Sequence, residues 1–175
     1  MKTFLLFCFL IIEASICRGQ ETLTAQDKHN YILSIDQHKI IELKRGYFNE
    51  HKYHLISVTV KLNNNSNETL KFLRMSCGID EIYKTNSKDV MLQRSVCQSN
   101  IPVEVTVDPH HNYEIKLPVL VKKGQQTHNF KFKMGMALIQ PTYDPSQDFL
   151  RIVYAYKLAD DKLLWSNEVE VLLSN

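Results

Sequence analysis

The chain has 175 residues, of which 44% are hydrophobic, 23% charged and 10% aromatic, and its formal net charge is +2. This composition is typical of a globular protein and excludes a disordered, collagen-like or coiled-coil chain, while the length predicts one domain with a sizeable core. Because 21 basic residues are balanced by 19 acidic ones, the charge predicts no nucleic-acid partner, which would need a dense basic face.

Residues 1–19 have the pattern of a secretory signal peptide. Lys2 supplies a positive charge, an apolar run extends from Phe4 to Ile12, and Gly19 is a small residue before the expected cleavage point. As a helix this run would span about 14 Å, half of the roughly 30 Å hydrocarbon core, so it is too short to cross a membrane. We therefore expect a secreted or periplasmic protein that is exported through a cleavable signal peptide.

The residues around the cleavage point also bear on a lipid anchor. Acylation of Cys17 would make the chain a lipoprotein, but bulky Ile16 stands where such a site has a small residue, so we expect no anchor. Residues 20–30 are polar apart from Leu23 and are expected to form a flexible leader. The folded domain is predicted over residues 31–175, with no transmembrane segment.

Two cysteines, Cys77 and Cys97, remain after the expected cleavage. In an oxidising compartment such a pair most simply forms a disulfide, which would close a loop of about 20 residues and contribute on the order of 3 kcal/mol. The alternative is a redox pair or half of a metal site. The spacing is not C-x-x-C and no histidine lies near either cysteine, so the structural disulfide is the prediction.

Two-residue alternation of apolar and polar residues predicts half-buried β-strands through most of the remaining chain. The clear strands are predicted at residues 53–62, 103–107, 113–119, 130–138, 150–158 and 163–171, and weaker ones at 31–35, 38–43 and 69–75. The strands at 150–158 and 163–171, joined by a turn at 159–161, are expected to form a terminal hairpin. Pro118 cannot donate to a ladder and indicates an edge or a strand end.

The spacing of these strands predicts an antiparallel sandwich, since no long helical period separates them. Residues 83–89, between the cysteines, are mostly polar. We expect the segment between the cysteines to leave the sandwich as a stapled excursion that carries a short helical turn.

Two runs of the sequence resemble secreted or periplasmic immunoglobulin-like β-sandwich modules. Residues 58–77 read as a strand, an Asn-rich turn and a second strand that ends in Met75-Ser76-Cys77, and residues 109–117 read as a proline-marked turn before a strand. The resemblance implies an all-β fold, a single antiparallel immunoglobulin-like β-sandwich with one disulfide-stapled excursion. Because Trp165 follows both cysteines, the Cys-Trp-Cys core of antibody domains is not expected.

The Asn-rich turn contains two sequons, Asn64-Asn65-Ser66 and Asn67-Glu68-Thr69. An exposed turn is a place where an asparagine-linked glycan would fit, so Asn64 and Asn67 are candidate glycosylation sites. The alternative is a plain β-turn, in which asparagine tolerates positive φ and bonds its own backbone. The sequence leaves both interpretations open.

No metal, cofactor or catalytic site is predicted. His51 and His54 would point to opposite faces of a strand, and the calcium-like spacing of Asp144 and Asp148 breaks at Phe149, where a glycine is required. No G-x-S-x-G elbow or phosphate-binding loop occurs. We therefore expect the chain not to be an enzyme, although a hydrolase triad from residues far apart in sequence remains an alternative.

Aromatic residues in predicted loops are the remaining candidate contacts with a partner: Tyr47, Phe48, Tyr143 and Phe149. The alternative is that they pack over the ends of the sandwich. The sequence thus predicts a non-enzymatic binding or accessory protein whose protein or glycan partner it does not identify. A further alternative is an inhibitor of a secreted protease that presents residues 101–102 or 141–145 from a rigid frame.

Overall fold

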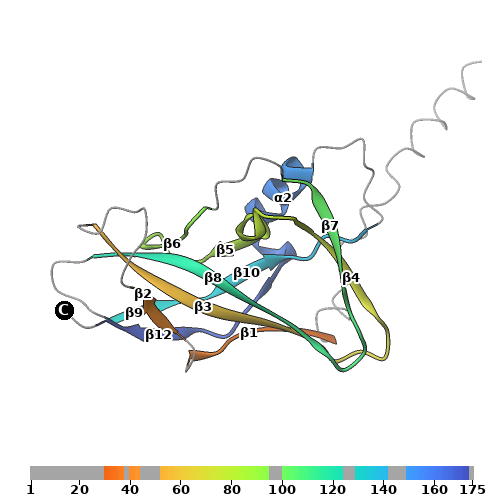
Figure 1. Cartoon of the computed structure of the whole chain (residues 1–175), viewed down its shortest axis with the longest axis horizontal. Coiled ribbons are helices and arrows are strands. Elements are labelled where there is room, and N and C mark those ends of the chain that lie inside the picture. Colours follow the sequence, from red (N-terminus) through yellow and green to blue (C-terminus); the bar gives the residue numbers. More distant parts are fainter. Residues whose placement is uncertain are drawn as a thin grey trace, which may run out of the picture.

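Antiparallel β-sheets form most of the structure, a computed structural model that describes residues 30–37, 40–43, 52–94, 100–123, 129–141 and 149–173. The expected signal peptide, Cys17 and the leader up to residue 29 lie outside these ranges. The predicted β-rich fold class is confirmed, with α2 as the one α-helix among the elements of the described residues (Figure 1).

The first sheet has the strand order β1-β3-β8-β6, and β2 pairs with β3 beside β1. Its strands have these bounds: β1 Tyr31–Ile35, β2 Ile41–Leu43, β3 Tyr53–Asn64, β6 Val90–Leu92 and β8 Asn112–Lys122. The alternation in β3 is confirmed, because Val58, Val60 and Leu62 are buried. Thr59 on the opposite face is buried as well, so β3 is covered on both sides there.

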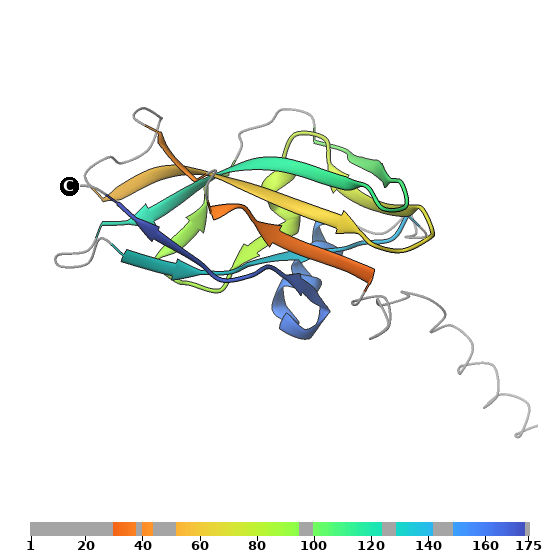
Figure 2. The same cartoon turned by 90° about the horizontal axis from the view of Figure 1, so that it is seen from below.

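The second layer is a long ribbon made of two consecutive ladders, β9 with β12 and β10 with β11, and β5 pairs with the free side of β10. Its strands have these bounds: β5 Tyr83–Thr85, β9 Asn129–Phe132, β10 Met134–Ala137, β11 Leu163–Trp165 and β12 Val169–Leu172. In both views the ribbon lies alongside the first sheet (Figure 1, Figure 2).

The predicted strands 130–138 and 163–171 are each divided in two by a bulge. Phe132 pairs with Val169, and Gly135 pairs with Trp165. Between these pairs the segment 133–134 faces the longer segment 166–168, and an extra residue on one strand is the definition of a β-bulge. Alternation alone does not reveal a bulge, so the sequence predicts each of these strands as continuous.

At one end of the molecule the ladder of β3 and β8 continues into a ladder of β4 (Leu70–Met75) and β7 (Pro102–Val107). The two connections are the turns at 65–69 and 108–111, seen at the lower right of Figure 1. The Leu73 amide donates to the Ile139 carbonyl at 2.8 Å. This bond joins β4 to the chain that leaves β10.

The segment between the cysteines does not form the predicted excursion. β5 pairs with β10 and β6 pairs with β8, so residues 83–92 cross from one sheet to the other and belong to both. Tyr83, at the start of this segment, is fully buried. The predicted short helical turn is confirmed as the 3-10 turn η3 (Ile79–Ile82).

The predicted strand 150–158, and with it the terminal hairpin, is wrong. This segment is the helix α2 (Phe149–Leu158), followed by the 3-10 turn η4 (Asp160–Lys162) where a turn was expected. Its buried residues Phe149, Ile152 and Val153 have the i, i+3, i+4 spacing of one helix face. Apolar residues on the outer face of the helix completed an alternating pattern that imitated a strand.

Pro118 lies within β8 and does not end it. Its carbonyl accepts a hydrogen bond from the Gln93 amide at 3.0 Å, and Gln93 directly follows the end of β6. Because the N and O atoms of a strand residue point to the same side, the missing N–H of Pro118 also faces the side on which β6 has just ended. Pro118 therefore lies at an edge only on the side of β8 where β6 has ended, and its other side remains within the sheet.

The core contains buried residues of both layers and of α2. At one edge the layers are joined through Asn167, which lies in the longer segment of the bulge. The Ile35 amide donates to Asn167 Oδ1 at 2.8 Å, and Asn167 Nδ2 donates to the Ile35 carbonyl at 3.3 Å. The side-chain amide of Asn167 thus pairs with both backbone groups of Ile35 at the edge of β1, as a residue of a neighbouring strand would.

Candidate functional site

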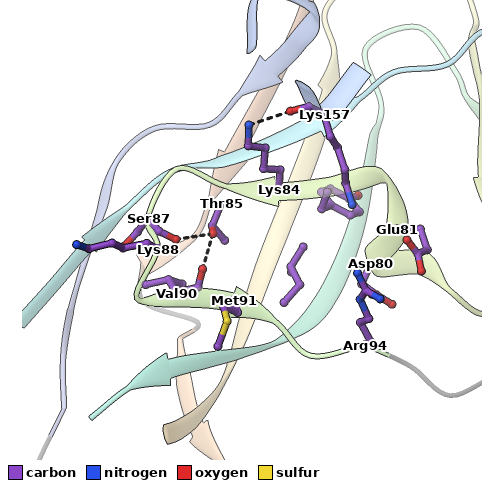
Figure 3. Close-up of a pocket in the computed structure, with 12 residues that line it drawn as sticks. Asp80, Glu81, Lys84, Thr85, Ser87, Lys88, Val90, Met91, Arg94 and Lys157 are labelled. Carbon is purple, nitrogen blue, oxygen red and sulfur yellow. Dashed lines mark hydrogen bonds between the residues drawn. The ribbon is translucent and has the colours of Figure 1, made fainter. Parts of the chain in front are cut away.

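An open pocket of about 360 Å³ lies where β5 and β6 approach each other at the edge between the layers (Figure 3). Six charged side chains line it, from η3, β5, the turn after β5, the end of β6 and the last turn of α2: Asp80, Glu81, Lys84, Lys88, Arg94 and Lys157. Four of them are cationic and two are anionic. None of these six residues was predicted from the sequence to be a site residue.

The turn between β5 and β6 forms one end of the pocket and is well bonded. The Thr85 hydroxyl lies within hydrogen-bond distance of the carbonyl oxygens of Ser87, at 3.1 Å, and of Val90. Asn86 exchanges hydrogen bonds with the backbone of Lys133, because its amide donates to the Lys133 carbonyl and its Oδ1 accepts from the Lys133 amide. The Thr85 and Asn86 side chains therefore act in holding the turn.

The side chain of Lys84 connects β5 to the C-terminal end of α2. Its Nζ donates to the Lys157 carbonyl at 2.8 Å and contacts Asp160 Oδ1 at 2.7 Å. A lysine at this place satisfies a terminal helix carbonyl and interacts favourably with the negative end of the helix dipole. Lys84 is thus engaged in positioning α2 beside the pocket.

Lys157 extends from α2 into the pocket and is half-buried. Burial lowers the pKa of its ammonium group, the carboxylates of Glu81 and Asp80 oppose this change, and the cations Arg94 and Lys84 add to it. Within the described part of the chain, its Nζ makes no hydrogen bond or ion pair. Lys157 is therefore a partly desolvated cation with unused donors.

The η3 wall of the pocket is held by Asn100. The Asn100 Oδ1 accepts hydrogen bonds from the amides of Cys77 and Gly78, at 3.3 Å and 3.0 Å. A side chain on Gly78 would collide with the Asn100 amide group, so a larger residue there would displace the side chain that bonds these two amides. Cys97 lies outside the described residues, and its predicted disulfide with Cys77 stays a prediction.

The two sequons occupy different environments at the corner between β3 and β4. Asn64 is 0% exposed, and its Nδ2 lies within hydrogen-bond distance of the carbonyls of Glu68, Val107 and Asp108. Asn67 is exposed and contacts His110 Nε2 through its Oδ1 at 3.0 Å. Glycosylation itself is untested, but a glycan on the buried Nδ2 of Asn64 would displace these bonds, so Asn67 is the accessible candidate.

Of the four predicted aromatic contacts, only Phe149 lies within the described residues. Tyr47, Phe48 and Tyr143 lie outside the described residues. Phe149 is buried at 4% exposure and belongs to the core, which agrees with the packing alternative for this residue. It cannot contact a partner in this conformation.

Sequence reasoning missed the outer face of α2. Leu150, Tyr154 and Leu158 follow one another at four-residue intervals and are 43%, 63% and 68% exposed. The i, i+4, i+8 spacing is a signal for a helix face, but the same three residues also fall on alternate positions of a strand. The face is apolar, exposed and carried by a helix whose inner face is anchored in the core.

The predicted inhibitor loop at residues 101–102 is bonded to the neighbouring chain. Ile101 is 59% exposed, but its carbonyl accepts from the Ser76 amide at 2.8 Å and its amide donates to Ser76 Oγ at 3.2 Å. Pro102 begins β7. Of the second predicted loop, 141–145, Pro141 alone is described.

The described ranges contain neither a cluster of metal-ligating side chains nor a membrane-spanning helix. No three His, Cys, Asp or Glu side chains among them come close enough to hold a metal ion, and His51, Asp144 and Asp148 lie outside them. None of the helices in the same ranges has the length and apolar character needed to span a membrane.

Comparison with known proteins matches no family model and finds no similar curated protein.

Proposed function

We propose that the chain is an exported, non-enzymatic binding module that recognises a protein partner through the outer face of α2. The observation that carries this proposal is the exposure of Leu150, Tyr154 and Leu158 on one face of a helix whose other face is buried. A helix that is apolar on both faces is ordinarily covered on both. An exposed apolar stripe on a rigid element is typical of an interaction surface.

The chemistry of the face favours a protein over a glycan. Leucine side chains offer only apolar contact, and Tyr154 adds a large aromatic ring, the residue type that most often anchors protein interfaces. Because Ile152 and Val153 fix the helix to the core, little conformational entropy is lost when a partner docks.

We further infer an immunoglobulin-like arrangement of the two sheets. In that fold one sheet has the order A-B-E-D and the other contains C, F and G. The order β1-β3-β8-β6 and the order β11-β10-β5 follow the same pattern when β1, β3, β6 and β8 are taken as A, B, D and E. This arrangement supports a scaffold role, and it does not by itself indicate the partner.

Affinity capture from the native exported fraction tests the proposal. The wild-type chain is expected to retain a specific protein, and the Tyr154→Ser/Leu158→Ser variant is expected to lose it while keeping the wild-type melting temperature. Leu172→Ser is the matched control, because Leu172 is 77% exposed on β12, away from α2 in sequence. Equal capture by all three chains, or turnover of a substrate without any partner, would contradict the proposal.

Protease inhibition is the second candidate, favoured by the exposed Ile101 side chain on a backbone held by Ser76. A rigid segment with an exposed apolar residue lowers the ordering cost of entering a protease pocket. A panel of secreted proteases assayed with excess protein is expected to lose activity with wild type and to recover it with Ile101→Asp. Unchanged activity across the panel would remove this candidate.

A further inference from the structure

We propose that the pocket between β5 and β6 binds a small molecule through an oxyanion group, a carboxylate or a phosphate, with Lys157 and Arg94 as its charged partners. This inference does not depend on the α2 face, which points to a protein. It concerns a different surface and a different class of ligand. The two proposals can therefore fail separately.

The arrangement of the two cations carries the inference. Lys157 enters the pocket from α2, and Arg94 enters from the opposite side, just after β6 (Figure 3). Neither side chain makes a hydrogen bond or ion pair with another residue in the described ranges. Lys157 and Arg94 repel each other, and the carboxylates of Glu81 and Asp80 act on Lys157 in the opposite direction without bonding to its Nζ. An oxyanion between the two cations would accept hydrogen bonds from donors that no group in the described ranges engages.

The balance of charge and the size of the pocket limit the ligand. The lining has four cations against the carboxylates of Asp80 and Glu81, and Lys84 is already engaged by Asp160. This surplus suits a ligand with one or two negative charges and disfavours a polyanion. A volume of about 360 Å³ is at the small end of the range for ligand pockets, so the ligand is small.

The environment of Lys157 gives the binding a pH dependence. The groups that face its ammonium are Glu81 and Asp80 from η3, Lys84 from β5 and Arg94 after β6. Burial and the two cations lower its pKa against the opposing effect of the carboxylates. An oxyanion stabilises the charged form, so binding is expected to weaken as the pH rises and Lys157 loses its proton.

An NMR titration of the full folded chain tests the site. Inorganic phosphate and succinate are added separately at constant ionic strength, and the backbone amide shifts are followed. Saturable shifts are expected at residues 80–94 and at Lys157. Lys157→Met and Arg94→Met, which keep an apolar stem of similar length, are each expected to weaken binding about tenfold.

Lys116→Met is the matched control, because Lys116 is exposed on β8 and does not line the pocket. It removes the same charge and is expected to leave the affinity unchanged. Saturation by phosphate alone would assign a phosphate ligand, and saturation by succinate alone a carboxylate ligand. Absence of saturable shifts with both probes, or an equal loss with Lys116→Met, would overturn the proposal.

Discussion

Asn64 joins two turns that lie far apart in the chain. Its Nδ2 reaches the carbonyls of Glu68 in one turn and of Val107 and Asp108 beside the other, while its Oδ1 accepts from Ser66. Its own backbone amide donates to the His111 carbonyl at 2.9 Å. The residue therefore fixes the corner at which the ladder of β3 and β8 turns into that of β4 and β7.

We expect Asn64→Ala to lower the free energy of unfolding by about 2 to 4 kcal/mol, because buried carbonyls lose their donor. Urea denaturation with an unchanged m value is the measurement. Asn65→Ala is the control, since Asn65 is exposed in the same turn, and it is expected to change stability by less than about 0.5 kcal/mol. Equal midpoints for the two variants would contradict a structural role for Asn64.

Tyr83 makes the stability of the fold depend on pH in the alkaline range. Burial raises the pKa of its phenol far above the usual value, Tyr113 acts in the same direction, and Arg74 opposes both. The unfolded chain loses this proton at about pH 10, while the folded chain keeps it. The contribution of Tyr83 to the free energy of unfolding is therefore fully present below about pH 10 and is lost as the pH rises further.

Accordingly, Tyr83→Phe is expected to make the fall in stability between about pH 9.5 and pH 11 less steep. Lys157, whose pKa is lowered by burial, has the opposite sign, and it is present in both proteins. Chemical denaturation at a series of pH values measures the slope. Tyr154→Phe, at an exposed position, is the control and should leave the slope as in wild type. The same slope in all three proteins would count against this account.

At the scale of elements, α2 shows how far the amino-acid pattern can mislead. Its inner face contributes Phe149, Ile152 and Val153 to the core, and its outer face contributes Leu150, Tyr154 and Leu158 to the surface. Together with Tyr156, they place an apolar or aromatic residue at every second position of the sequence from 150 to 158. Periodicity could not separate a strand from this helix, because both faces are apolar.

The two faces of α2 are expected to respond differently to truncation. Ile152→Ala should lower the free energy of unfolding by about 2 to 4 kcal/mol, since it opens a cavity in the core. Leu150→Ala, on the exposed face, should cost less than about 1 kcal/mol. Thermal and urea unfolding of both variants measure the difference. Similar losses would be expected of a strand buried on both faces and would contradict the helix.

The long strands could be predicted because their alternation is carried by many residues. β3 and β8 pair over their whole lengths and bury one face continuously, so the pattern is clear. β5 and β6 are only three residues long, and the turn that joins them, residues 86–89, is polar. Their places are set by pairing with β10 and β8, which is contact between distant parts of the chain.

The pocket could not be predicted for the same reason. Lys157 and Arg94 are far apart in the sequence, and each resembles an ordinary surface cation when read alone. They meet only because residues 83–92 cross between the sheets and α2 packs beside them. Sequence patterns report local periodicity, whereas this site depends on the non-local pairing that follows from folding.

At the scale of the whole molecule, the predicted disulfide between Cys77 and Cys97 would close the loop that contains η3, β5 and β6. Peptide mapping of the exported protein without reduction is expected to recover the two cysteines in one linked species. Cys97→Ser and Cys77→Ser/Cys97→Ser should lower the free energy of unfolding by the same amount, about 3 kcal/mol. Two free thiols in the exported protein would exclude the disulfide.

The central feature of this molecule is that residues 83–92 belong to both sheets and hold the layers and the pocket in place. Cross-strand NOEs in the folded chain measure this most directly. The structure predicts contacts of Lys84 with Gly135 and of Met91 with Leu120, together with slow exchange of the amides in β5 and β6 that pair with β10 and β8. NOEs from 83–85 only to 90–92, with rapid exchange throughout that segment, would show an excursion outside the sheets and contradict the account.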